Sequence, residues 1–92
     1  MISDENKKKI VKIAKRYNVS KIILFGSCAQ DKREGNDIGL AVEGVSPSEF
    51  YNFYGDLLFG LPKPVDIVNL SHKNKFTQMI FREGIILYGP SS

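Results

Sequence analysis

The sequence predicts a small α/β domain in which one mixed β-sheet packs against flanking helices. Helical and strand-like patterns alternate along the chain in the order α-β-β-α-β-α-β, which favours a single sheet with helices on its surface. A chain of 92 residues has the length of one domain, so residues 1–92 are expected to fold as one unit. The composition, 42% hydrophobic and 25% charged, is that of an ordinary globular protein.

A helix is expected over residues 4–17, followed by two strands over residues 21–25 and 37–42. The helix has Ser3 as its candidate N-cap, and its apolar residues recur at helical spacing. The first strand is too short and too rich in β-branched residues to be a helix. Residues 26–36 form a long irregular connection between the strands, of the kind that often carries function.

The second half of the chain is predicted to add a helix, a strand, a helix and a strand. The capping-box pattern Ser46-Pro47-Ser48-Glu49 starts the first of these helices, and a proline ends it. A strand over residues 65–70 follows, and then a helix over residues 72–82. The inward side chains of that helix are expected to be Phe76, Met79 and Ile80. The last strand is expected over residues 85–88.

Positive charge is concentrated in the first predicted helix. Six of the thirteen Lys and Arg residues lie between Lys7 and Arg16, in a chain whose formal net charge is +3. This stripe either meets an anionic partner, such as nucleic acid or an acidic protein surface, or forms the solvated outer face of an amphipathic helix. The sequence leaves both interpretations open.

A cytoplasmic location is expected. The single Cys28 offers no internal disulfide, which suits a reducing compartment. The chain contains no apolar run long enough to span a membrane, and the N-terminal lysines are not followed by the apolar segment of a signal peptide. With one His and one Cys, the chain also lacks the ligands of an ordinary zinc site.

The turn after the first strand predicts a phosphate contact. Gly26 lets the backbone approach a phosphate closely, and Ser27 supplies a hydroxyl beside the exposed amides of the turn. On its own, a Gly-Ser pair after a strand is equally an ordinary turn.

Two aspartates add a possible metal site. Asp37 opens the second strand, and Asp66 lies within Val-Asp-Ile-Val of the third. Aspartate is depleted in strands, and a carboxylate among β-branched residues needs a cation or another partner if it is buried. Two carboxylates on neighbouring strands would hold Mg²⁺ shared with a nucleoside triphosphate. The alternative for Asp66 is a surface-facing position on a half-exposed strand.

Together these motifs resemble the signature of the DNA polymerase beta-like nucleotidyltransferases. The stretch Leu24-Phe25-Gly26-Ser27, nine further residues and then Asp37-Ile38-Gly39 is similar to the pattern Gly-Ser-x9-Asp-x-Asp. The segment Pro64–Val68 is similar to the strand that carries the third carboxylate of the family. The closing segment Arg82–Tyr88 also resembles the small stand-alone branch, the minimal nucleotidyltransferases (MNT). The resemblance covers nearly the whole chain.

The resemblance implies a fold, a reaction and a partner. Members of the family share the DNA polymerase beta-like nucleotidyltransferase fold and transfer a nucleoside monophosphate, such as AMP from ATP, to a hydroxyl with the help of Mg²⁺. By resemblance, Gly26 and Ser27 would contact the triphosphate, and Asp37 and Asp66 would be the catalytic metal ligands. Many MNT proteins are antitoxins of HEPN toxins, in some systems by adding AMP to the toxin, so the resemblance implies a HEPN-type protein partner.

The chain departs from the family pattern at Gly39, where the second aspartate of Asp-x-Asp would stand. Residues i and i+2 of a strand project from the same face, so two carboxylates at this spacing can bind the same ions. Gly39 provides no ligand, which predicts a degenerate site that holds one Mg²⁺ or none. In an ordinary β conformation, Gly39 is expected to accept a side chain, so that Gly39→Asp would rebuild the ligand pair.

Three functions therefore remain open from the sequence. The chain could transfer AMP to a hydroxyl of a protein partner through the degenerate metal site. It could instead be a catalytically inactive, antitoxin-like binding partner of a HEPN protein. The third function is a nucleic-acid-binding module that uses the basic first helix.

Overall fold

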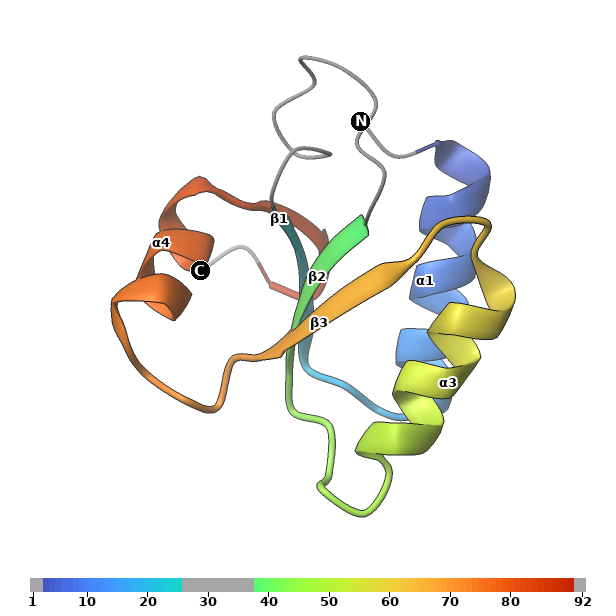
Figure 1. The fold of residues 1–92 in the computed structure, drawn as a ribbon, viewed down its shortest axis with the longest axis horizontal. Helices are drawn as coiled ribbons and strands as arrows, with labels where there is room; N and C mark the ends of the chain where they lie inside the picture. Colours follow the sequence, from blue (N-terminus) through green and yellow to red (C-terminus); the bar gives the residue numbers. More distant parts are fainter. Residues whose placement is uncertain (1–2, 26–37, 91–92) are drawn as a thin grey trace.

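The structure, a computed structural model, describes residues 3–25 and 38–90. Its elements follow one another in the predicted order (Figure 1). They are α1 (Asp4–Arg16), β1 (Lys21–Phe25), β2 (Ile38–Glu43), α3 (Phe50–Gly60), β3 (Val65–Asn69), α4 (Lys75–Glu83) and β4 (Ile85–Tyr88). The predicted α/β class with one mixed sheet is confirmed.

Four strands form the sheet, in the order β3-β2-β1-β4. Strand β1 runs antiparallel to both β2 and β4, and β2 runs parallel to β3. A parallel pair needs a long crossover connection, which α3 provides between β2 and β3. The three strands that carry the predicted motifs, β1, β2 and β3, are therefore neighbours in the sheet.

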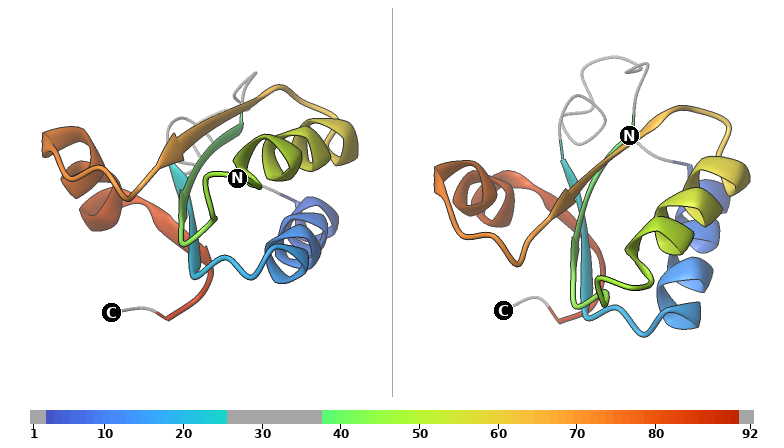
Figure 2. Two further views of the ribbon diagram at one scale, coloured as in Figure 1. Left: turned by 90° about the horizontal axis from the view of Figure 1, so that it is seen from below. Right: turned by 60° about the horizontal axis from the view of Figure 1, so that its bottom comes forward.

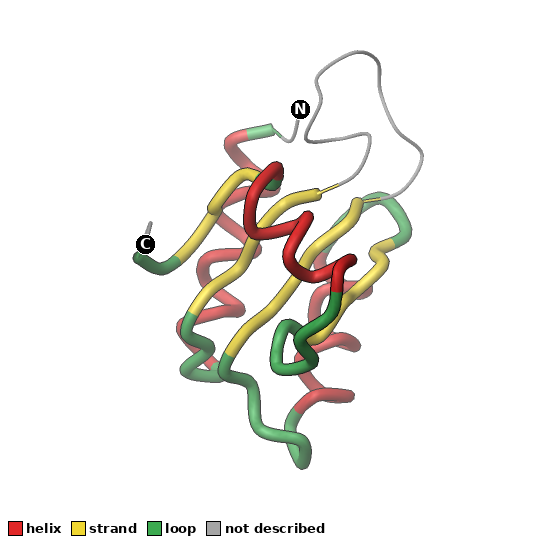
Figure 3. Tube along the Cα trace, turned by 90° about the vertical axis from the view of Figure 1, so that its left-hand side faces the viewer, coloured by secondary structure: helices red, strands yellow, loops and turns green. Residues whose placement is uncertain are grey.

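Helices cover both faces of the sheet. Helices α1 and α3 pack on one face, and α4 crosses the other (Figures 2 and 3). The side chains of β1 alternate between these layers, because Ile22 and Leu24 join the hydrophobic cluster of α1 and α3 whereas Ile23 joins the cluster of α4. Burial on both faces explains why β1 is an almost continuous apolar run.

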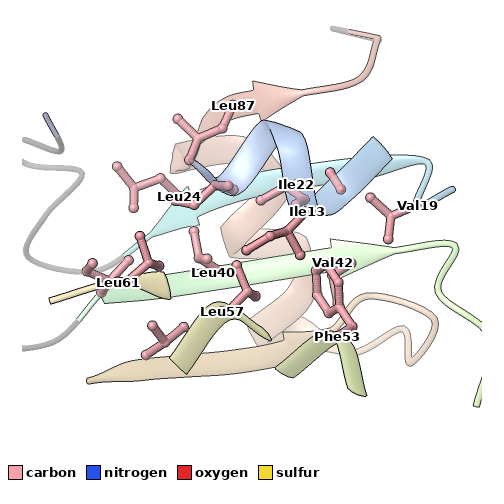
Figure 4. Close-up of a cluster of buried hydrophobic side chains, with 14 residues drawn as sticks. Ile13, Val19, Ile22, Leu24, Leu40, Val42, Phe53, Leu57, Leu61 and Leu87 are labelled. Carbon is pink, nitrogen blue, oxygen red and sulfur yellow. The ribbon is translucent and has the colours of Figure 1, made fainter. Parts of the chain in front are cut away.

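The larger core lies between the sheet and the helices α1 and α3 (Figure 4). Helix α1 contributes Ile10, Ile13 and Ala14, and α3 contributes Phe53 and Leu57, each no more than 6% exposed. The lysines of α1 are exposed, as expected for the outer face of an amphipathic helix. None of the helices in the described ranges combines the length and apolar character that a membrane crossing requires.

Helix α3 begins later than the capping-box pattern predicts. It starts at Phe50, and Ser46–Glu49 precede it as a turn in which the Glu49 N–H donates to the Ser46 carbonyl oxygen at 3.0 Å. The Ser46 hydroxyl lies 3.5 Å from Glu49 Oε1 and donates to that carboxylate. The predicted capping box is therefore wrong, because the backbone carbonyl has taken the N–H that the serine hydroxyl would accept.

Helix α4 also begins later than predicted, after an N-cap at Asn74. The Thr77 N–H donates to Asn74 Oδ1 at 2.9 Å, and the Asn74 N–H donates to Thr77 Oγ1 at 3.0 Å. With the helix anchored in this way, Thr77 and Ile80 are its buried residues. The prediction that Phe76 and Met79 point inward is wrong, because these side chains are 47% and 36% exposed.

A polar contact joins α1 to α3. Asp56 Oδ2 accepts hydrogen bonds from the Tyr17 hydroxyl at 2.7 Å and from Arg16 Nη1 at 3.0 Å. The hydrogen bond from Tyr17, assisted by the Arg16 guanidinium, lowers the pKa of Asp56. The same hydrogen bond raises the pKa of Tyr17. Asp56 therefore keeps its charge to lower pH in the folded chain than in the unfolded chain.

Leu57→Ala is expected to lower the free energy of unfolding by about 2–5 kcal/mol, because Leu57 is fully buried and its truncation leaves a cavity. Leu58 is the next residue of the same helix and is 45% exposed, so Leu58→Ala is a matched control expected to cost less than about 1 kcal/mol. Urea unfolding followed by circular dichroism measures both variants. Equal losses would contradict the packing of α3.

Asp56→Asn is expected to lower the Tm more at neutral pH than in strong acid, where the parent carboxyl is protonated as well. A lowered carboxyl pKa contributes stability that is fully present above the unfolded-state value of 3.8 and is lost as the pH falls through the folded-state value. At still lower pH Asp56 is protonated in the parent as well, so the two Tm values should converge. Melting curves across this acidic range provide the measurement, and a Tm difference that does not change with pH would contradict the interaction.

Candidate functional site

One end of the sheet brings the predicted motifs together. Strand β1 ends at Phe25, and Phe25 pairs with Gly39 of β2. Gly39 in turn pairs with Asp66 of β3. Because residues paired across neighbouring strands share a face of the sheet, Phe25, Gly39 and Asp66 form a row across it. We refer to these three residues as the strand-end row.

The strand-end row lies on the face of the sheet that α4 crosses. Ile23, Ala41 and Val68 stand two positions along from the three members of the row, and they belong to the hydrophobic cluster that contains Ile80 of α4. Since strand side chains alternate between faces, the row shares this face. Helices α1 and α3 lie on the opposite face (Figure 2).

Asp66 is an exposed carboxylate in an otherwise largely apolar strand. Within the described part of the chain it makes no hydrogen bond and no ion pair. Exposure keeps the carboxylate hydrated, so no buried partner is required. The position fits the surface-facing interpretation of Asp66, and it also leaves both oxygens accessible to a ligand.

The other predicted site residues, Gly26, Ser27 and Asp37, lie outside the described residues. The phosphate contacts of the Gly-Ser turn and the convergence of Asp37 with Asp66 therefore stay predictions. The described residues on either side of positions 26–37 are Phe25, at the end of β1, and Ile38, at the start of β2. These strand ends are neighbours in the sheet, and the start of β3 lies beside that of β2.

Gly39 is closely covered by Phe25. A Cβ atom at position 39 would lie 2.7 Å from the Phe25 carbonyl oxygen and 3.2 Å from two carbons of its ring. The first distance is shorter than side chains tolerate, so β1 and β2 must move apart before position 39 can carry one. The expectation that Gly39 readily accepts a side chain needs this correction, since the close approach of the two strands depends on the missing Cβ.

The surroundings of the row are aromatic on the side of α4. The rings of Phe25 and Phe76 meet edge to face, with centroids 5.9 Å apart. Such pairs add about 0.5–1.5 kcal/mol beyond the burial of their area. The Phe25 ring is therefore held between Phe76 and Gly39, at the end of the row opposite Asp66.

The described residues do not form a magnesium site by themselves. In those ranges no three side chains of His, Cys, Asp or Glu come together. Asp66 supplies one carboxylate, and its neighbour Gly39 supplies none. Protein sites for Mg²⁺ commonly combine one or two carboxylates with substrate phosphates, so a site here would also need Asp37 and a bound triphosphate.

Comparison with known proteins agrees with the strand order and the motifs. Residues 8–92 match the family model described as Polymerase beta, Nucleotidyltransferase. The chain belongs to this family. A search of curated proteins gave no significant match.

Several solved structures similar to this nucleotidyltransferase domain are of toxin–antitoxin pairs. One is a toxin–antitoxin crystal structure with AMP-PNP, at 27% identity and a TM-score of 0.76, covering 92% of this chain and 74% of the other. A second is a tri-AMPylated HEPN toxin from Shewanella oneidensis in complex with its MNT antitoxin, at 24% identity and a TM-score of 0.74, covering 97% and 74%. A third is the pair MntA–HepT, at 23% identity and a TM-score of 0.72, covering 96% and 74%. The last two identities show a common fold.

Sequence reasoning missed the aromatic residues beside the row. Phe25 was treated only as the last residue of a strand, and Phe76 was expected in the core. The sequence contained a signal for this contact, because β1 and β2 form an antiparallel pair. In such a pair a residue near the end of β1, here Phe25, lies opposite a residue near the start of β2, here Gly39. A glycine at the second of these positions favours a large neighbour at the first.

Gly39→Ala is expected to lower the free energy of unfolding by about 1–3 kcal/mol, because the added methyl would meet the Phe25 carbonyl oxygen and ring. Gly55 in helix α3 is the matched control, since a Cβ there would meet nothing within 4 Å. Gly55→Ala should stabilise by about 0.4–1 kcal/mol through the unfolded state. Denaturant unfolding of both variants tests this, and a neutral Gly39→Ala would show that the two strands separate freely.

Proposed function

We propose that the chain is an MNT-type nucleotidyltransferase domain that binds a nucleoside triphosphate and a HEPN-type protein, and that it transfers AMP to this partner slowly. In this proposal the Gly26-Ser27 turn contacts the phosphates. Asp37 and Asp66 would hold a single Mg²⁺, which would polarise the transferring phosphate and neutralise charge on it. The acceptor would be a hydroxyl of the partner, whose oxygen would form a bond to the α-phosphorus of ATP as the bond to the β-phosphate breaks. Pyrophosphate and the hydroxyl proton would leave.

Family membership and the similar structures support the partner and the nucleotide. The chain matches the nucleotidyltransferase model over residues 8–92. One similar toxin–antitoxin structure contains AMP-PNP, and another contains an AMPylated HEPN toxin with its MNT antitoxin. These proteins are related in fold to this chain, so the same pairing and the same nucleotide chemistry are the natural proposal for it.

The pairing of Gly39 with Asp66 is the observation on which the slow transfer rests. By resemblance, position 39 is where the family places its second carboxylate, and here this position directly adjoins the third. The described site therefore holds one acidic side chain where two would be neighbours. A metal contributes several kcal/mol to transition-state stabilisation, and about 4 kcal/mol corresponds to roughly a thousandfold in rate.

An inactive antitoxin-like partner is the second candidate function. The tight approach of Phe25 to Gly39 favours it, because the strands have closed over the position that the second carboxylate would need. In this case the domain would bind the HEPN-type protein and leave it unmodified. The two candidates differ in a measurable product, the AMP-modified partner.

Asp66→Asn is expected to weaken Mg·ATP binding by about tenfold, since one of the two proposed ligands loses its charge. Isothermal titration calorimetry at millimolar Mg²⁺ gives the dissociation constants. Asp4→Asn is the control, because Asp4 lies on α1, which covers the opposite face of the sheet. Undetectable ATP binding by the parent chain would favour the inactive partner, and equal affinities for the two variants would remove Asp66 from the site.

Gly39→Asp separates the two candidates further. If a metal site remains at the row, the variant should raise AMP transfer at least about tenfold, a modest share of what a metal ligand supplies. The added carboxylate and the contact with Phe25 should also lower the Tm in EDTA, and Mg²⁺ should restore part of this loss. The assay uses labelled ATP and a purified HEPN-type protein. If the variant shows no gain in transfer and Mg²⁺ does not change its Tm, the inactive binding partner is the candidate that remains.

A further inference from the structure

Helix α3 presents the most exposed apolar side chain among the described residues. Phe59 is 93% exposed, although a buried phenylalanine would add substantially to the stability of so small a domain. Single exposed apolar residues are common on protein surfaces and need no explanation. Phe59 differs because it borders a groove.

The groove lies between α1 and α3 and has a volume of about 400 Å³. Its apolar lining comes from Ile13, Phe59 and Gly60. Gly60 helps to keep it open, because a Cβ at this position would point toward Ile13 and come within 3.8 Å of its Cδ1 atom. The two helices lie side by side on the face of the sheet opposite α4 (Figure 2). The groove is therefore separate from the strand-end row.

The charges along the groove are mainly positive. Lys9, Lys12 and Arg16 line it from α1, and Asp56 is its acidic lining residue among those described. Asp56 Oδ2 accepts hydrogen bonds from Arg16 at 3.0 Å and from the Tyr17 hydroxyl at 2.7 Å. The negative charge of Asp56 and the positive charge of Arg16 therefore largely offset one another. Lys9 has an exposed pairing with Glu5 at 3.9 Å, which is of the weak kind. Lys9 and Lys12 thus set the electrostatic character of the groove.

We propose that this groove, with Phe59 at its rim, is the surface on which the HEPN-type protein docks. The fitting partner surface has an apolar pocket that receives the Phe59 ring and carboxylates that meet Lys9 and Lys12. A protruding aromatic residue surrounded by charged groups is the usual anatomy of an interaction hot spot. The complementary charge would steer the encounter and fix its orientation. The inference rests on the proposed function only for the identity of the partner.

Nucleic acid fits the same groove less well. Phosphates would approach Asp56 and Glu5 as well as the lysines, and both carboxylates would repel them. Single-stranded nucleic acid also stacks on platforms of several aromatic rings, whereas Phe59 is the one ring among the described lining residues. Binding of RNA is accordingly an outcome of the test that would overturn the proposal.

The test uses the full chain and a purified HEPN-type protein, with affinity measured by biolayer interferometry. Phe59→Ser and the double variant Lys9→Glu/Lys12→Glu should each weaken the complex at least about tenfold. The double variant should act mainly on the association rate and should reduce its dependence on salt. Every side chain changed in these variants and in their controls is exposed, so circular dichroism should show unchanged folding.

Matched controls lie elsewhere on the surface. Tyr51→Ser removes another highly exposed ring of α3, at 81% exposure, that does not line the groove. Lys73→Glu/Lys75→Glu changes the net charge equally at the start of α4. Both controls should leave the affinity within about threefold of the parent, which is the usual result for residues outside a hot spot.

Each outcome bears on a different claim. If the parent chain and the HEPN-type protein form no complex, the proposed function fails at its partner. If the complex forms and the groove variants bind as tightly as the controls, the docking surface is elsewhere and this inference is wrong. If the groove variants lose binding to a single-stranded RNA probe and keep the protein complex, the groove is a nucleic-acid site.

Discussion

The central strands β1 and β2 are buried on both faces, and the rest of the fold depends on this constraint. All but the last residue of each strand is buried. Two-sided burial requires helices on both sides of the sheet, which α1 with α3 and α4 provide. It also moves polar chemistry away from the middle of the strands. An exposed carboxylate can stand only at a strand end or on the edge strand, which is where Asp66 is found.

The strands and their order along the chain could be predicted from local sequence because their signals are strong. The apolar run of β1 and the short last strand have the predicted bounds, and β2 and β3 differ by a residue at an end. The first residue of each helix was harder to predict than the strands. A capping pattern shows which hydrogen-bond donors and acceptors are available, but it does not show which of them form a hydrogen bond. At Ser46 the backbone carbonyl accepts the Glu49 N–H, whereas at Asn74 the side chain accepts the Thr77 N–H. The apolar pattern also placed Phe76 and Met79 inward, whereas Thr77 and Ile80 are the buried residues of α4.

The candidate site could be predicted as a list of residues and not as a packed environment. Asp66 and Gly39 were recognised from spacing, and the register places them side by side. The contact between Gly39 and Phe25 depends on how closely two strands approach, which no motif encodes. This contact changes the meaning of the glycine. At an open position a substitution would easily restore a missing carboxylate. At position 39 the aromatic ring of Phe25 has packed over the glycine, so the strands must separate before a side chain fits.

The two proposed surfaces lie on opposite faces of the sheet, and this arrangement limits how they could act together. A partner seated in the groove between α1 and α3 faces away from Asp66, across a molecule whose extents are 35 × 29 × 20 Å. An extended chain covers roughly 3.3 Å per residue, so a tail of about ten residues would span about 33 Å and could reach around the sheet. A flexible tail of roughly that length would therefore let the acceptor hydroxyl reach the strand-end row within one complex. A hydroxyl held beside the groove would instead have to be replaced by one from a second partner molecule, which would make transfer depend on partner concentration even when every groove is occupied.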